Sequence, residues 1–499
     1  MRKIMERQMK IGEVDISTIK FDLRCRDEIP KILIGLQHIY CTPPIRREVF
    51  KILKDAIPKG INPNNGRPGM DLWKILVLGI IRLGCNWDYD KLQEIANNHK
   101  TLRQMLGHGT CDDYCYALQT LKDNVSLLTP EVLDKINKVV VKAGHTLVGK
   151  KEGEKLKGRC DSFVAKTDVH YPTDINLLFD AIVKVIHLIT LLCFSSGIPG
   201  WRQSQHNIQK IKKLFRKAQN LKRSTSQDEK KKAERQKIII AAHQAYLDVV
   251  EPFLERVKET IKMLREGHLS KEEKLQEVEK YIKHAQRQMN QIRTRVIEGK
   301  DIPHNEKVFS IFEEHTEWIC KGKAGVSQEL GLRVCILEDE HGFILHYQVM
   351  EKQTDDKVTV AMVKEAKEKF PGLSMCSFDK GFYTPMNKEE LRKLLDKVIL
   401  PKKGKLSSSD KEVEYSEEFI QARRKHSAVE SAINALENHG LDRCPDHGTT
   451  GFKRYVALAV LARNIQILGN IVQQKALKRQ RRIGKFERIR QDRPYRLAA

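Results

Sequence analysis

A long helical stretch separates two groups of strand-like segments, and this separation constrains the fold more than any other feature. One strand-like segment, residues 158–165, precedes the stretch, and two more, residues 332–337 and 343–349, follow it. Residues 201–300 between them are rich in Lys and Glu and carry three stripes of apolar side chains at helical spacing. If all the strands share one sheet, the chain must leave that sheet and return to it. We therefore expect an all-α insertion, a helical hairpin or coiled coil, inside a sheet domain.

The segments after the helical stretch predict a sheet domain of the α+β or α/β class. The strands at 332–337 and 343–349 flank a short turn containing Gly342, which is a hairpin signal. A helix over 358–370 and a buried strand over 373–378 follow. The order is strand, hairpin, helix, strand, with more helices beyond.

Three acidic residues stand where such a domain can present chemistry. Asp379 follows the strand 373–378, and Gly381 permits a tight turn that leaves the carboxylate exposed. Asp161 lies inside the strand 158–165, against β propensity. Glu430 lies on a helix that we expect over residues 423–438. Each acid taken alone is also compatible with ordinary turn or surface chemistry.

Taken together, the three acids predict a metal site. Two Asp and one Glu supply the hard oxygen ligands that Mg²⁺ prefers, with Mn²⁺ as a substitute. A pair of such ions activates a water or hydroxyl and stabilises the leaving oxygen in phosphodiester cleavage. The catalytic and metal-binding residues expected from the sequence are therefore Asp161, Asp379 and Glu430.

The segments around these acids resemble the Asp-Asp-Glu signature of insertion-sequence transposases, and most closely the ISNCY family. Asp161 lies in C-D-S-F-V-A-K-T-D-V-H-Y-P-T-D, Asp379 in S-F-D-K-G-F-Y, and Glu430 in H-S-A-V-E-S-A-I-N-A-L-E-N-H-G-L. The opening M-R-K-I-M-E-R-Q and the segment V-F-S-I-F-E-E-H-T-E-W-I-C-K-G-K-A-G also resemble that family, so the resemblance extends over most of the chain.

The resemblance implies an RNase H-like catalytic domain, with two acids on adjacent central strands and the third on a helix beside them. It implies a DNA transposase that binds terminal repeats, cleaves DNA ends and joins the 3′-OH ends to target DNA as a homodimer or higher oligomer. Related transposases often place Tyr and Arg before the Glu and Lys after it. Here His426 precedes Glu430 by four residues and Glu437 follows it by seven, so the roles of those basic residues do not carry over.

Two other functions remain open from the sequence. The first is an RNase H-like DNA nuclease without strand transfer, which joining assays with pre-cleaved ends distinguish from a transposase. The second is a domesticated DNA-binding protein without catalysis, which would bind DNA independently of metal.

Charge and composition favour a nucleic-acid partner. The chain of 499 residues has 90 Lys and Arg against 65 Asp and Glu, a formal net charge of +25. Such an excess suits a polyanion, although a merely basic soluble protein fits it too. The 11 cysteines include no Cys-x-x-Cys pair, and the N-terminus has no apolar signal region. We expect a cytoplasmic prokaryotic protein that joins the nucleoid when it acts and crosses no membrane.

Three basic groups are candidates for DNA contacts, and for each the alternative is an ordinary solvated surface. One is a loop after an apolar strand, one precedes Glu430, and one lies on the first helix of the expected insertion. Their members are Lys402, Lys403 and Lys405; Arg423, Arg424, Lys425 and His426; and Lys210, Lys213, Arg216 and Lys217.

The expected organisation has five parts. Residues 1–150 form an all-α N-terminal domain for DNA binding or dimerisation, and residues 473–499 form a basic tail. The catalytic domain comprises 155–200 and 301–472, with 201–300 as the helical insertion. Within this scheme Asp174 is expected to cap the helix that begins at residue 175.

Overall fold

The computed structural model describes residues 3–5, 12–55, 69–109, 111–151, 153–268, 271–320 and 328–491. The chain forms two compact units: unit 1 comprises Met1–Asp168 and Ile319–Ala499, and unit 2 comprises Val169–Trp318. The protein is mixed α and β, with 63% helix and one mixed sheet of seven strands. This confirms the predicted class in its coarse form. The N-terminal motif M-R-K-I-M-E-R-Q lies mostly outside the described residues.

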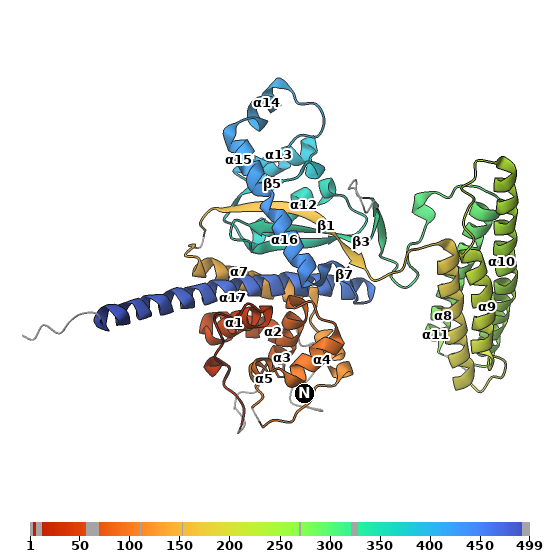
Figure 1. Ribbon diagram of the computed structural model, residues 1–499, viewed down its shortest axis with the longest axis horizontal. Helices are drawn as coiled ribbons and strands as arrows, with labels where there is room; N and C mark the ends of the chain where they lie inside the picture. Colours follow the sequence, from red (N-terminus) through yellow and green to blue (C-terminus); the bar gives the residue numbers. More distant parts are fainter. Residues whose placement is uncertain are drawn as a thin grey trace, which may run out of the picture. The chain divides into compact units, whose positions relative to one another are not determined.

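The sheet belongs to unit 1, and β1 lies at its centre (Figure 1). β3 pairs with β1 antiparallel on one side, and β4 pairs antiparallel with β3. On the other side β5 pairs with β1 parallel, and β6 pairs with β5 parallel. The strands are β1 (Leu156–Thr167), β2 (Glu317–Cys320), β3 (Gln328–Asp339), β4 (Ile344–Met350), β5 (Leu373–Phe378), β6 (Lys397–Ile399) and β7 (Arg443–Cys444).

Residues of β1 alternate between two apolar cores. Cys160 belongs to the core beneath α12, whereas Phe163 and Ala165 belong to the larger core that also contains α16 and α17. Because neighbouring residues of a strand point to opposite faces, Asp161 lies on the face of Phe163. Its partner on β3, Ile336, belongs to the same large core.

The helices before β1 pack around α17 rather than forming a separate domain. α1, α3 and α7 all contact α17, and their apolar residues share one core with a face of the sheet. The expected separate domain over residues 1–150 is therefore part of unit 1. These helices are α1 (Glu28–Cys41), α2 (Pro43–Asp55), α3 (Leu72–Gly84), α4 (Tyr89–Asn98), α5 (Lys100–Met105), α6 (Leu118–Val125) and α7 (Pro130–Leu147).

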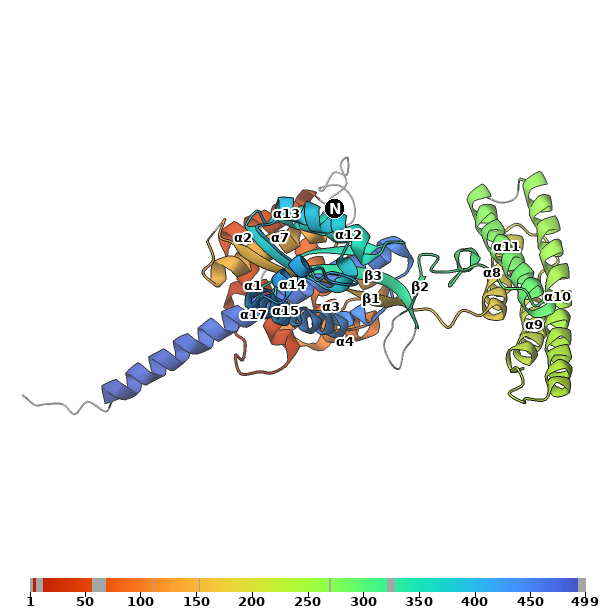
Figure 2. The ribbon, with the colours of Figure 1, turned by 90° about the horizontal axis from the view of Figure 1, so that it is seen from above.

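The helices after the hairpin cover both faces of the sheet and carry Glu430. They are α12 (Asp355–Lys369), α13 (Pro385–Leu394), α14 (Ser408–Glu414), α15 (Glu417–His426), α16 (Ala428–Leu436) and α17 (Gly448–Gln491). The single helix expected over 423–438 is wrong, because it is interrupted at Ser427 and ends in a π-helical turn, Glu437–Leu441. The basic segment from residue 473 also continues α17 up to Gln491, and this end of α17 extends away from the sheet (Figures 1 and 2).

Unit 2 consists of four long helices around their own apolar core, as the insertion predicts. They are α8 (Asp174–Ser195), α9 (Ser204–Gln219), α10 (Glu229–Glu266) and α11 (Glu272–Ile292). The unit is wider than residues 201–300, since α8 packs against α9 and α11. The N-cap of α8 is Thr173 rather than Asp174, and Asp174 instead forms an ion pair with Arg295 at 2.7 Å.

Among the residues that the structure describes, two helices are long and apolar enough to span a membrane by length and composition alone. They are α8 and the Gly448–Ile483 part of α17. The α17 segment is mostly buried in the core of unit 1, and half of the α8 window is buried in the protein. Core helices of globular proteins pass the same test, so this is weak evidence for a membrane.

Candidate functional site

Asp161 and Asp379 lie side by side on the two central parallel strands. Cys160 of β1 is the registered partner of Phe378, the last residue of β5, so the next residue of each strand is an Asp. Asp161 is half-buried, and one of its oxygens accepts a hydrogen bond from the backbone N–H of Ser162 at 2.7 Å. Asp379 is exposed at the start of a short 3₁₀ turn, and its carboxylate makes no capping hydrogen bond there.

Glu430 approaches from the first turn of α16. Val429, Ala432 and Leu436 bury one side of this helix in the large core, and α16 contacts β1. Glu430 is left exposed on the other side. In the described part of the chain, the carboxylates of Glu430 and Asp379 have no hydrogen-bond or ion-pair partner. Both carboxylates are therefore free to bind a ligand.

A fourth acid, Asp355, lies near these three on the Ser162 side of β1 and was not expected from the sequence. It is the first residue of α12, and its side chain accepts a hydrogen bond from Ser162 Oγ at 2.6 Å. Its carboxylate also lies against Gly381, where a Cβ atom would approach Asp355 Oδ2 to 3.2 Å. The expected helix began at residue 358, so Asp355 fell in a turn, where an acid before a helix is ordinary.

The pKa of Asp161 shows that these acids interact. Burial raises its pKa to about 6, the hydrogen bond from Ser162 opposes the rise, and the charges of Asp379, Asp355 and Glu430 add to it. Asp161, Asp355, Asp379 and Glu430, here called the four-acid cluster, are therefore close enough for the other three charges to act on Asp161. A bound cation would relieve both the burial cost and the mutual repulsion.

His426 lies next to this cluster at the end of α15. Its ring Nδ1 is 3.0 Å from Ser377 Oγ on β5, so the hydroxyl fixes the ring. Burial is the main cause of a lowered pKa for His426, while the charges of Asp379 and Glu430 oppose that shift. The His426 ring is therefore neutral at pH 7. It can form a hydrogen bond, but it supplies no positive charge to a phosphate group.

Arg159, two residues before Asp161, ties β1 to its surroundings. Its guanidinium donates to the carbonyl of Asp339 at 2.8 Å and to that of Lys425, the penultimate residue of α15, at 3.4 Å. It also approaches the buried carboxylate of Glu338 to 2.9 Å, although the angle is not that of a hydrogen bond. Burial raises the pKa of Glu338 to about 7 despite the opposing charge of Arg159.

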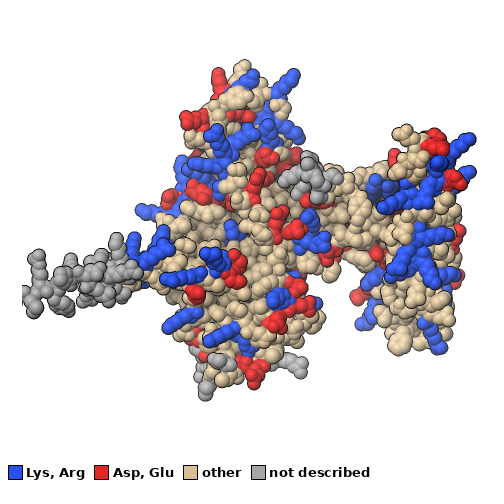
Figure 3. Space-filling view, viewed as in Figure 1, with Lys and Arg blue, Asp and Glu red and all other residues tan. Residues whose placement is uncertain are grey.

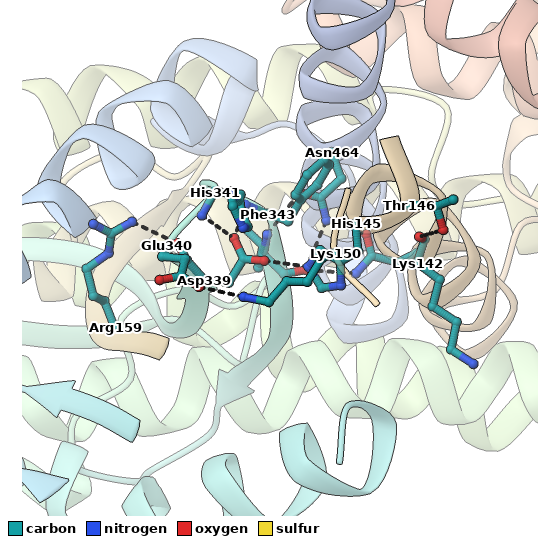
Figure 4. Close-up of polar contacts among 12 residues, drawn as sticks. Lys142, His145, Thr146, Lys150, Arg159, Asp339, Glu340, His341, Phe343 and Asn464 are labelled. Carbon is teal, nitrogen blue, oxygen red and sulfur yellow. Dashed lines mark hydrogen bonds and ion pairs between the residues drawn. The ribbon is translucent and has the colours of Figure 1, made fainter. Parts of the chain in front are cut away.

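The end of β3 next to Arg159 is pinned to α7 (Figure 4). Asp339 is fully buried and 2.6 Å from His145 Nε2, and its other oxygen accepts the backbone N–H groups of His341 and Phe343. Lys150, beyond α7, pairs with Glu340 at 2.5 Å. Both carboxylate oxygens of Asp339 are thus used in holding the hairpin, so the contact between Asp339 and His145 has a structural role.

The four-acid cluster offers the type of ligand that a hard divalent cation binds, but its carboxylates do not converge on a common point. Among the described residues no group of three His, Cys, Asp or Glu side chains stands in metal-binding geometry. The cluster offers only carboxylate oxygens, which are the ligands of Mg²⁺ and Mn²⁺. Gathering requires rotation of Asp379 and Glu430, and both side chains are exposed and without partners, so rotation costs little.

The expected basic residues fall into two groups. In unit 1, Lys402 pairs with Asp410 at 2.5 Å, which compromises it as a phosphate contact. The other expected DNA-binding cations of unit 1 are exposed: Lys403, Lys405, Arg423, Arg424 and Lys425. The last three lie in the last turn of α15, directly before α16 and Glu430. The remaining four expected residues, Lys210, Lys213, Arg216 and Lys217, are exposed on α9 of unit 2. Figure 3 shows Lys and Arg over much of the visible face of that unit.

Comparisons of the chain with protein-family models, curated proteins and solved structures find no match. The functional argument therefore rests on the geometry of the chain itself.

Proposed function

We propose that this protein is a DNA transposase of the Asp-Asp-Glu type with an RNase H-like catalytic domain. The observation that carries the proposal is the register of β1 and β5, which brings Asp161 and Asp379 together at the centre of the sheet. Glu430 completes the set from α16, whose apolar side packs in the same core as Phe163 of β1. An RNase H-like domain is expected to have this arrangement of two acids on adjacent strands and one on a helix.

The strand order supports the same proposal. An antiparallel hairpin, β3 and β4, flanks β1 on one side, and the parallel strands β5 and β6 flank it on the other. The helical unit is inserted between β1 and the hairpin, so the acids come from segments that are distant in sequence. Distant segments that converge on one set of carboxylates favour a site over a solvated surface.

The roles of the residues follow from their burial and partners. Asp161 is fixed by the Ser162 N–H and supplies one carboxylate oxygen from a half-buried position. Asp379 and Glu430 supply mobile carboxylates from the surface. When bound, Mg²⁺ ions would activate the attacking water or 3′-OH and stabilise the leaving oxygen of the phosphodiester.

The DNA strand is held by cations next to the acids. Arg423, Arg424 and Lys425 form the last turn of α15, directly before Glu430, and are exposed. Phosphate contacts of this kind position DNA without reading its sequence. Transposition joins two DNA ends, so we propose that the active form on DNA is a dimer or larger.

Cleavage of DNA that contains the sequences flanking the coding region tests the proposal. With Mg²⁺, we expect the wild-type protein to release 3′-OH ends and to join them to target DNA. Asp161→Asn, Asp379→Asn and Glu430→Gln should each lower the cleavage rate by about 10³-fold or more while end binding persists. Glu412→Gln, at an exposed position of α14, is the matched control and should cleave normally.

Three results would contradict parts of this proposal. Cleavage at the wild-type rate by any of the three acid variants would remove that acid from the active site. Cleavage without joining of pre-cleaved ends would make the protein a nuclease, and binding without cleavage at any metal concentration would make it a non-catalytic DNA-binding protein.

A further inference from the structure

Unit 2 contains a pocket that the proposed chemistry does not use. It lies between the segment before α8 and the segment after α11, and its volume is about 410 Å³. Sites for small ligands typically span about 300–1,000 Å³. Every residue that lines the pocket belongs to unit 2, and Trp318, the last residue of that unit, also lies in β2.

One wall of the pocket is aromatic. Trp318 lies at its centre, with the ring of Tyr171 at 5.6 Å in an edge-on arrangement and the ring of Phe309 also at 5.6 Å. His304 extends the wall from Phe309 at 5.2 Å. Tyr171 is 60% exposed and Trp318 is only half-buried, so these rings are not simply core. Exposed aromatic rings of this kind are stacking platforms for planar ligands.

The rest of the lining is cationic. Arg223, Arg295 and Lys307 all border the pocket, and Asp174 is the one acid among the lining residues. Asp174 is already paired with Arg295 at 2.7 Å. In the described chain the side chains of Arg223 and Lys307 have no ion-pair or hydrogen-bond partner. The pocket therefore suits a ligand with a planar ring against the aromatic wall and an anionic group near Arg223 and Lys307. A nucleotide has both parts.

A basic helix leads to the pocket. The exposed face of α9 carries Lys and Arg with no Asp or Glu in the helix, and the residues that follow it continue to Arg223 on the pocket rim. The end of α9 is fixed to the start of α8 by a hydrogen bond from Gln219 to Asn176 at 2.9 Å. A polynucleotide backbone lying along α9 would therefore reach the pocket without a break in positive charge.

We propose that this pocket binds a nucleobase unstacked from a single strand of DNA, with its phosphate held by Arg223 and Lys307. The nucleotide chemistry rests on the pocket, whereas DNA as the source rests on the proposed function. Extruding a base costs a few kcal/mol, which stacking on an aromatic ring offsets.

Single-stranded DNA binding to the full-length protein tests this proposal, with EDTA present so that no cleavage occurs. Two fluorescein-labelled oligonucleotides of equal length are compared by anisotropy, one with bases and one with abasic sugars throughout. We expect Trp318→Ala to weaken binding of the intact strand about tenfold and to leave binding of the abasic strand unchanged. Tyr171→Ala should also weaken binding of the intact strand. Because Tyr171 is exposed, misfolding of this variant would not explain the loss.

The controls separate this pocket from other aromatic surfaces. Phe312→Ala removes a ring that is 51% exposed in the same segment but does not line the pocket, and it should bind both strands normally. Arg223→Gln should weaken both strands alike, because it removes a phosphate contact.

Two outcomes would overturn the proposal. Equal binding of the intact strand by wild type, Trp318→Ala and Tyr171→Ala would show that no base enters the pocket. Competition by dAMP as strong as that by the oligonucleotide would assign the pocket to a free nucleotide instead of DNA. Because the assay measures binding in EDTA, where no cleavage occurs, failure of the base pocket and failure of the transposase chemistry give different results.

Discussion

Replacing Asp161 with Asn should make the metal-free protein more stable at neutral pH. Asp161 is a half-buried carboxylate near three other acids, and its pKa is raised from 3.8 to about 6. Between pH 4 and 6 the folded protein therefore binds more protons than the unfolded chain does. Stability consequently falls as the pH rises through this range, and the loss is complete above it. Asn carries no charge and avoids this loss.

The magnitude follows from the pKa shift. A shift of about two pKa units corresponds to about 3 kcal/mol at pH 7. The amide oxygen of Asn can still accept the Ser162 N–H, so the variant keeps that contact. For a unit as large as unit 1, about 3 kcal/mol corresponds to a Tm increase of about 3–5 °C.

Thermal unfolding in EDTA at pH 7 and at pH 4 measures this effect. We expect Asp161→Asn to exceed wild type at pH 7 and to lose most of that advantage near pH 4, where Asp161 is protonated in the folded protein and partly protonated in the unfolded chain. Asp168→Asn is the control, since Asp168 is exposed near the end of the same strand and pairs with Arg443 at 3.4 Å. It should change stability by less than about 0.5 kcal/mol.

Adding Mg²⁺ should reverse the order at pH 7, because the metal stabilises only the protein that keeps all its carboxylates. The reasoning is refuted if Asp161→Asn is no more stable than wild type at pH 7 in EDTA. It is also refuted if the gain is the same at pH 4, because a pH-independent gain has nothing to do with charge.

Three further predictions concern packing. Asp446→Ala should cost about 3–5 kcal/mol in unfolding experiments, because it leaves the guanidinium of Arg82, 1% exposed and 2.8 Å from Asp446, buried without its partner; a loss below 1 kcal/mol would contradict this. Gly469→Ala should lower the Tm, because its Cβ would overlap the carbonyl of Lys31 where α1 crosses α17; an unchanged Tm would show that the helices separate freely. Thr173→Ala should destabilise unit 2 by about 1 kcal/mol as measured by hydrogen exchange of the first turn of α8, and unchanged exchange would exclude the cap.

Short-range patterns in the sequence predict much of the fold. The strand expected over 373–378 has those bounds in the structure, because a short, mainly apolar run between Gly372 and Asp379 has few alternatives. The all-round apolar segment after residue 70 is the buried helix α3. The insertion was predictable because Lys- and Glu-rich helical stripes cannot form a buried strand.

Features that depend on pairing between distant segments were not predictable. The contacts of Arg159 with Glu338 and with the end of α15 depend on the register of β1 with β3, which no local pattern specifies. Asp355 joins the acids only because α12 begins beneath β1 and Ser162 reaches it. The continuation of α17 past residue 473 reflects the high helix propensity of Lys and Arg, which add turns to a helix already formed.

A crystal structure with Mn²⁺ tests the central claim most directly. The account predicts an anomalous peak bound by carboxylate oxygens of Asp161 and Asp379 at about 2.0–2.2 Å, with Glu430 rotated towards it. The same soak of Asp379→Asn should show no peak there. A saturated crystal with no Mn²⁺ between these two aspartates, or with Mn²⁺ bound only elsewhere, would contradict the proposed active site.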